Sequence, residues 1–316
     1  MVAGGHRLSV ICPPRMQPKQ RGDIMITIND NEILAVVLMG GGKRGRFQIE
    51  PLKKLDELGL LRRTNILVGT SIGGAAVATL AKNWNNNPVQ ALEKLWGGIK
   101  KNTDIYDGKL DVWGFMKMAI TKCKSILNQQ GLYKITKNNF QGTKLKNLAI
   151  DVAITATNLN RRRPEYFSTK TTPEMDLGLL VNMTTAIPGA LQYQVYNGDK
   201  YADGGALNNI PIKTAIELGA TKIIMIATGV YDFGRIDIKD DGMSVLLATL
   251  NTLLYYPESE MFKTIKKDFP SVEILYLYAD KDTGDALDFN PDNLKEYGRE
   301  MAEKYWTPEV LKEWAK

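Results

Sequence analysis

Residues 65–80 read Asn-Ile-Leu-Val-Gly-Thr-Ser-Ile-Gly-Gly-Ala-Ala-Val-Ala-Thr-Leu. The apolar run at the start predicts a short buried strand, and the small residues after it predict a helix that packs closely on a sheet. Between them, Gly69 and Gly73 flank Ser71 at the spacing of a nucleophile elbow, the tight strand-to-helix turn that presents a serine hydroxyl. Glycine is needed on both sides because a β-carbon there would collide with neighbouring backbone. The structural alternative is a glycine turn in which the serine only caps the helix.

A second glycine-rich loop, Gly40-Gly41-Gly42-Lys43-Arg44-Gly45, follows the apolar run 33–39 and precedes a helical pattern over 47–61. Free backbone N–H groups at such a helix start favour an anion. The loop therefore fits either a nucleotide phosphate or the oxyanion of an acyl-transfer reaction, and a purely structural turn is the third interpretation. A dinucleotide site also needs an acidic residue at the end of the next strand, and residues 68–71, Val-Gly-Thr-Ser, contain none.

The chain contains a single histidine, His6, within residues 1–24, which we expect to be a disordered extension. A serine hydrolase built on Ser71 therefore needs another proton acceptor. Asp203 stands before Gly204 and Gly205, where little local side-chain bulk blocks its carboxylate from another side chain. Such a carboxylate can take the serine proton directly. An ordinary Asp-Gly turn is the alternative for this motif.

The glycine loop, the Gly-x-Ser-x-Gly elbow and Asp-Gly-Gly, in this order, resemble the patatin-like phospholipases. The resemblance covers roughly residues 31–230 and includes the segment 184–190, Thr-Thr-Ala-Ile-Pro-Gly-Ala. Met39 departs from the family pattern, which often has an acidic or small polar residue there.

The resemblance implies a lipid acyl hydrolase that acts on glycerophospholipids or related acyl lipids without a cofactor or metal. Ser71 would be the nucleophile and Asp203 the base, with Gly69 and Gly73 framing the elbow. The oxyanion would be held by the loop of Gly40, Gly41, Gly42, Lys43, Arg44 and Gly45. A nucleotide-binding α/β protein and a catalytically silent lipid-binding relative are the other interpretations.

The alternation of strand and helix patterns predicts an α/β fold with a mainly parallel sheet. The resemblance makes this a three-layer α/β/α sandwich of the patatin or FabD-lysophospholipase type. We expect one domain over residues 25–316, with a basic helical insertion at about 100–146. Predicted strands cover 33–39, 65–69, 147–156, 221–228 and 272–279. Predicted helices cover 47–61, 72–83, 88–101, 112–127, 211–218, 243–256 and 291–304.

Positive charge is concentrated in residues 100–146, which contain ten lysines and three aspartates, a net charge of +7 against +6 for the whole chain. Trp113, Met116, Ile120, Cys123 and Leu127 recur there at spacings of three and four, as on one face of a helix. This basic amphipathic pattern is typical of a helix that contacts an anionic membrane and caps a lipase site. A solvated surface helix that packs on the sheet explains the same pattern equally well.

Two cysteines, Cys12 and Cys123, imply no disulfide framework and favour a cytoplasmic setting, with peripheral membrane contact if the basic helix binds lipid. Residues 8–12 are too short for a signal-peptide core. A pI near 9.0 also suits nucleic acid, but no zinc-ligand, helix-turn-helix or RNA-binding pattern supports that partner, so none is expected. The sequence does not define an oligomeric state.

Overall fold

The computed structural model describes residues 29, 31–230, 245, 264–265 and 267–316. Two sequence predictions lie outside these residues, namely the disordered extension at 1–24, which carries His6, and, apart from residue 245, the helix at 243–256. No helix within the described ranges combines the length and the apolar character needed to span a bilayer.

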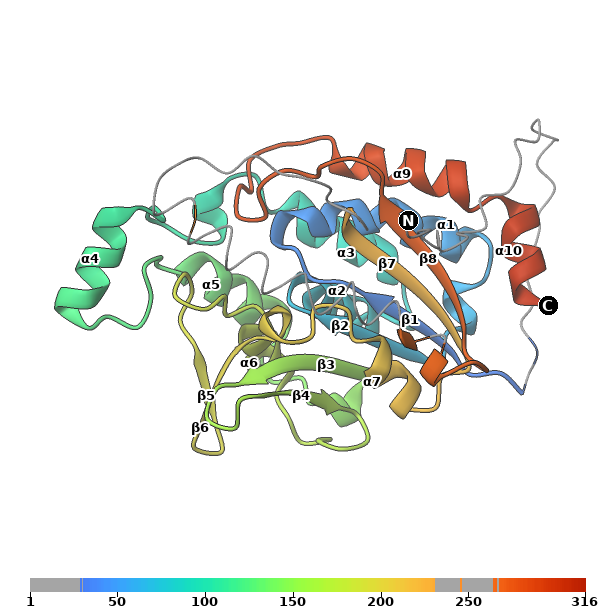
Figure 1. Ribbon diagram of the computed structural model, residues 1–316, viewed down its shortest axis with the longest axis horizontal. Helices are drawn as coiled ribbons and strands as arrows, with labels where there is room; N and C mark the ends of the chain where they lie inside the picture. Colours follow the sequence, from blue (N-terminus) through green and yellow to red (C-terminus); the bar gives the residue numbers. More distant parts are fainter. Residues whose placement is uncertain (1–28, 30, 231–244, 246–263, 266) are drawn as a thin grey trace, which may run out of the picture.

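One eight-stranded sheet forms the centre of the molecule (Figure 1). The strands are β1 (Leu34–Leu38), β2 (Ile66–Thr70), β3 (Asp151–Asn158), β4 (Arg163–Ser168), β5 (Gln194–Tyr196), β6 (Asp199–Asp203), β7 (Lys222–Val230) and β8 (Glu273–Ala279). The parallel part has the order β3-β2-β1-β7-β8. Strands β4 and β6 each pair antiparallel with β3, and β5 pairs antiparallel with β6. The predicted mainly parallel α/β sheet is therefore confirmed.

Both faces of the sheet are buried, which explains why its central strands are apolar without interruption. On β1, Leu34, Val36 and Leu38 belong to one buried cluster, and Ala35 and Val37 belong to another. The first cluster includes residues of α1 (Ile49–Glu57), α2 (Ile72–Lys82), α3 (Pro88–Gly97), α6 (Leu177–Thr184) and α9 (Leu294–Tyr305). The second includes residues of α7 (Ile212–Glu217) on the opposite face. Helices thus cover the sheet on both sides, as a three-layer sandwich requires.

Several predicted helix boundaries were wrong. The pattern over 47–61 begins as a 3₁₀ turn at Gly42–Gln48, continues as α1 and ends at Glu57. The pattern over 112–127 ends earlier, because α4 (Val112–Thr121) stops at Lys122 in the left-handed conformation. Leu127 then leaves the helix face and is buried in the main core. The helices α5 (Gln130–Asn139), α6 and α10 (Pro308–Ala315), and strands β4 to β6, were not predicted.

Candidate active site

Ser71 stands where β2 turns sharply into α2. Its backbone has φ 55° and ψ −127°, a combination that non-glycine residues adopt only under strain. Its backbone N–H donates to Thr184 Oγ1 at 2.7 Å, and that hydroxyl donates to the Thr155 carbonyl at 2.6 Å. The strained turn is therefore held by a buried side chain of α6, and it has the geometry expected of a nucleophile elbow.

The two flanking glycines are required by close backbone contacts. A β-carbon at Gly69 would lie 2.5 Å from the Gly73 carbonyl oxygen, and one at Gly73 would lie 2.2 Å from the Leu38 carbonyl oxygen. Neither oxygen belongs to a flexible side chain. The turn can therefore close only because both positions lack a side chain.

Gly73→Ala is expected to lower the free energy of unfolding by about 3 kcal/mol or more, because the backbone of β1 must shift to accept the methyl group. Urea unfolding followed by circular dichroism measures the change. The matched control is Gly97→Ala at the end of α3, where a β-carbon meets nothing within 4 Å, so stability should change by less than about 0.5 kcal/mol. Equal stability of the two variants would contradict the tight turn.

Strand pairing explains why Asp203 meets Ser71. Along one edge of β3, Thr155 pairs with Thr70 of β2, and the next residue, Ala156, pairs with Asp203 of β6. Asp203 therefore takes the place along β3 that the chain vacates when it turns away at Ser71. Gly204 allows this approach, since a β-carbon there would lie 2.3 Å from the Thr155 carbonyl oxygen.

The two side chains are joined by a short hydrogen bond. Ser71 Oγ donates to Asp203 Oδ2 at 2.6 Å, and the Gly205 backbone N–H donates to Asp203 Oδ1 at 2.7 Å. Both residues are buried, with Ser71 7% and Asp203 5% exposed. Burial raises the pKa of the Asp203 carboxyl from 3.8 to about 7, although the hydrogen bonds from Ser71 and Gly205 oppose the rise.

The loop Gly40–Gly45 lies against this pair. A β-carbon on Gly40 would be 2.9 Å from the Ser71 β-carbon, so the loop backbone passes directly beside the serine. Gly41 and Gly42 have φ of 148° and 58°, values that side chains disfavour. Asn209 and Thr228 hold the start of the loop. The Gly40 N–H donates to the Asn209 backbone carbonyl at 3.3 Å, and the Thr228 hydroxyl donates to the Gly40 carbonyl.

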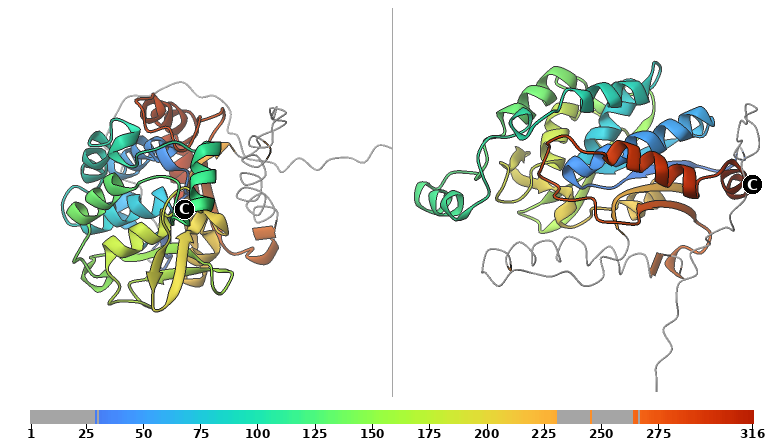
Figure 2. Two further views of the ribbon diagram at one scale, coloured as in Figure 1. Left: turned by 90° about the vertical axis from the view of Figure 1, so that its left-hand side faces the viewer. Right: turned by 90° about the horizontal axis from the view of Figure 1, so that it is seen from above.

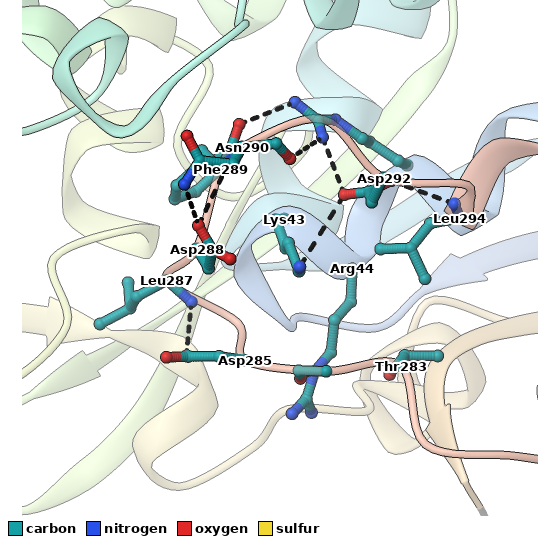
Figure 3. A network of polar contacts seen from close by, with 12 residues as sticks. Lys43, Arg44, Thr283, Asp285, Leu287, Asp288, Phe289, Asn290, Asp292 and Leu294 are labelled. Carbon is teal, nitrogen blue, oxygen red and sulfur yellow. Dashed lines mark hydrogen bonds and ion pairs between the residues drawn. The ribbon is translucent and has the colours of Figure 1, made fainter.

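The other end of the loop is anchored by the segment that follows β8 (Figure 3). The Lys43 N–H donates to the Ala286 carbonyl at 2.8 Å, and Arg44 Nε donates to the Gly284 carbonyl at 2.8 Å. Arg46 is buried and donates to Asp292 Oδ2 at 2.8 Å and to the Asn290 carbonyl at 2.9 Å. The segment 284–292 thus fixes a loop that lies about 240 residues earlier in the chain.

Neither Ser71 nor Asp203 lines a cleft of about 330 Å³ that is bounded by β3, β4 and the residues 207–217, including Tyr166 and Asn209. We assign it no part in presenting a substrate to Ser71.

The sequence model of the patatin-like phospholipase family matches residues 36–216, a span that begins in β1 and includes Ser71 and Asp203. This chain belongs to the patatin-like phospholipase family. The predicted resemblance is therefore confirmed.

Curated relatives of this patatin-like chain include lysophospholipase nte1 of Aspergillus niger, which is 25% identical over 218 residues, or 69% of this chain and 13% of that protein. Lysophospholipase nte1 of Aspergillus oryzae is 25% identical over 219 residues, with the same coverage. Uncharacterized protein R571 of Acanthamoeba polyphaga mimivirus is 25% identical over 190 residues, covering 58% of this chain and 62% of that protein. The chain thus spans about an eighth of the length of the nte1 proteins.

Similar solved structures include VipD from Legionella pneumophila, with a TM-score of 0.47, 14% identity, and coverage of 95% of this chain and 71% of that one. Human GIVD cytosolic phospholipase A2 in complex with methyl gamma-linolenyl fluorophosphonate has a TM-score of 0.47 and 11% identity, covering 90% and 59%.

The patatin-like site also uses residues that the motifs did not single out. Thr184, Asn209, Thr228 and Ala286 each bond to the elbow or to the glycine loop. Thr184 begins the segment 184–190 noted in the sequence, and Asn209 lies six residues after Asp203. Thr228 and Ala286 carry no sequence signal, because their role depends on where β7 ends and where the segment after β8 lies.

Proposed function

We propose that this patatin-like protein hydrolyses acyl esters of lipids, with Ser71 as the nucleophile and Asp203 as the base. The observation that supports it best is the 2.6 Å hydrogen bond from Ser71 Oγ to a buried carboxylate, on a strained elbow. A carboxylate with a pKa near 7 is a much better base for an alcohol than one with the usual value. The buried environment of Asp203 thus does part of the work of a triad histidine.

The proposed reaction has two steps, acylation of Ser71 and hydrolysis of the acyl-enzyme. Ser71 Oγ attacks the ester carbonyl carbon while Asp203 takes its proton, and the tetrahedral adduct collapses as Asp203 returns the proton to the departing alcohol oxygen. Water then attacks the acyl-enzyme, Asp203 takes the water proton, and the adduct collapses to free acid as the proton passes to Ser71 Oγ. No cofactor or metal enters this scheme.

The oxyanion is assigned to the backbone N–H groups of Gly41 and Gly42. In the part of the chain that the structure describes, neither N–H has a hydrogen-bond acceptor. The Lys43 N–H, by contrast, is bonded to Ala286, so its role in this proposal is to anchor the loop. Arg44 is assigned to the same anchoring role through Gly284. Two preorganised donors of this kind stabilise a developing oxyanion by several kcal/mol, about 3 per donor.

The substrate class proposed is glycerophospholipids and related acyl lipids, and the lysophospholipase names of the fungal relatives favour lysophospholipids among them. Product analysis by mass spectrometry, after incubation of wild type and Ser71→Ala with phospholipids and lysophospholipids, tests the proposal. Release of fatty acid by wild type only would support it. Bound nucleotide without hydrolysis would favour the nucleotide interpretation, and lipid binding without hydrolysis would favour a silent relative.

The pH profile should follow the protonation of Asp203. Its folded-state pKa is raised to about 7, so the carboxyl becomes protonated and inactive as a base below that pH. We expect kcat/KM for a soluble acyl ester to fall about tenfold per pH unit below pH 7 and to level off above it.

Histidine, with an ordinary pKa of about 6.5, would give a similar profile. Because His6 is the single histidine of the chain, one variant removes that explanation. His6→Ala should keep both the activity and the inflection near pH 7. An inflection that disappears in this variant would restore a histidine to the mechanism.

A further inference from the structure

The helix α4 exposes an apolar face. Trp113 and Ile120 are each 76% exposed and Met116 is 47% exposed, at spacings of three and four that place them on one side of the helix. The other large exposed apolar residues among those described are scattered over the chain, at Ile33, Leu159, Val195, Leu207 and Val245. The cluster on α4 is thus a local surface feature, which we call the α4 face (Trp113, Met116 and Ile120).

The helix projects away from the body of the molecule, at the left of Figure 1 and in the right-hand view of Figure 2. Its base is closed by a pair of hydrogen bonds of 2.8 Å between the backbones of Asp107 and Asn128. Next to this pair, Leu127 is buried in the core and its N–H donates to the Ala190 carbonyl at 3.0 Å. The projection is therefore held by a fixed base.

The base lies beside the site. The Ile126 N–H donates to the Gly189 carbonyl, and three residues earlier the Ala186 carbonyl accepts the N–H of Asp203 at 2.8 Å. The same short segment, 186–190, thus contacts both the base of the projection and the proposed catalytic carboxylate. The base of the projection and the proposed catalytic carboxylate are therefore connected through one short segment.

Four lysines lie within α4 or close to its ends in the chain. Lys109, Lys117, Lys122 and Lys124 are all exposed, and no ion pair is formed by any of them within the described part of the chain. Two aspartates lie on the same projection. Asp111 caps α4 by accepting the Gly114 N–H at 2.9 Å, and the Asp107 side chain accepts the Gly108 N–H at 2.9 Å. The lysines are thus left to face solvent.

We propose that the α4 face inserts into the surface of an anionic lipid bilayer, with these lysines against its headgroups. Exposed apolar side chains on a projecting helix, with exposed lysines on the helix and next to its ends, match the two layers of such a surface, acyl chains below and negative charge above. The biological use of this contact rests on the proposed function, since a lipid hydrolase must reach its substrate at an interface. The binding itself does not depend on turnover.

Vesicle flotation with the full chain tests the proposal, using phosphatidylcholine alone and a phosphatidylcholine and phosphatidylserine mixture. All measurements are repeated in the Ser71→Ala background, so that failure of the proposed catalysis cannot alter the result. Wild type should bind the mixed vesicles and should be released by high salt. The triple variant Trp113→Ser/Met116→Ser/Ile120→Ser should bind the mixed vesicles at least about tenfold more weakly than wild type.

Lysine neutralisation tests the second part of the surface. Lys109→Gln/Lys117→Gln/Lys124→Gln should weaken binding to the mixed vesicles by about fivefold per lysine, while Lys53→Gln/Lys312→Gln, at exposed lysines on α1 and α10, should not. The apolar control is Leu159→Ser/Val195→Ser, which removes two exposed apolar side chains elsewhere. Trp113→Phe should keep binding but lose the blue shift of tryptophan emission that accompanies insertion.

Thermal unfolding of each variant separates a folding defect from a binding defect. Equal vesicle binding by wild type and the folded triple variant would overturn the proposal. Failure of wild type to bind either kind of vesicle would also overturn it. That result includes a protein that instead dimerises through α4 or binds DNA at matched salt.

Discussion

Ser71→Ala is expected to lower the hydrolysis of acyl esters by about 10³-fold or more, because no other side chain occupies the elbow to accept the acyl group. The change removes one oxygen atom from a buried site and leaves both glycine contacts intact, so the protein should remain folded. Initial rates on a soluble ester and on lysophospholipid vesicles measure the loss. Labelling by a fluorophosphonate probe should disappear with it.

The matched control is Ser168→Ala. Ser168 is also buried, 1% exposed, but its hydroxyl contacts Thr171 on the far side of β3 from Asp203. Turnover and labelling should both persist in this variant. Persistent labelling of Ser71→Ala would place the nucleophile at a different residue.

Asp203→Asn is expected to cause a loss of similar size, about 10³-fold or more. The amide has the shape of the carboxylate and can still accept the Gly205 N–H, but it cannot take a proton from Ser71. Labelling should slow as well, because the probe also needs an activated hydroxyl. The double variant with Ser71→Ala should be no less active than either single variant, since the two residues act as one unit.

Asp199→Asn provides the control on the same strand. Asp199 lies at the other end of β6, bonded to Asn158 and Arg161, and hydrogen bonding lowers rather than raises the pKa of its carboxyl. Its loss should leave kcat unchanged. A near-normal rate in Asp203→Asn would show that the proton leaves Ser71 by another route.

Much of the fold could be predicted because its strands have unmistakable patterns. Residues 33–39 are apolar throughout, and residues 66–68 form a second apolar run, with a glycine or serine turn after each. Strands β1 and β2 lie within a residue of the predicted bounds, 33–39 and 65–69. Strands β5 and β6 escaped prediction because they are only three and five residues long and have no clear alternation of apolar and polar residues. The end of α4 was missed because Leu127 continues the helical spacing, whereas its side chain packs into the core.

The chemistry of Asp203 was only partly foreseen. The motif indicated a carboxylate near Ser71, but a carboxylate of ordinary pKa is a weak base for an alcohol. Its raised pKa comes from burial, which depends on β6 continuing the line of β2 beside β3. No local pattern records this burial, because the strands are joined only in the folded sheet.

Because Ala286 anchors Lys43, the glycine loop can be fixed in place only late in the synthesis of the chain. Synthesis delivers Ser71, the glycine loop and Asp203 long before it delivers β7, which supplies Thr228, and the segment 284–292. A nascent chain that ends just after residue 216 carries the whole family match, yet it lacks the groups that hold the loop in place. The groups that we propose for hydrolysis are therefore held in place only after the residues up to 292 have joined the fold.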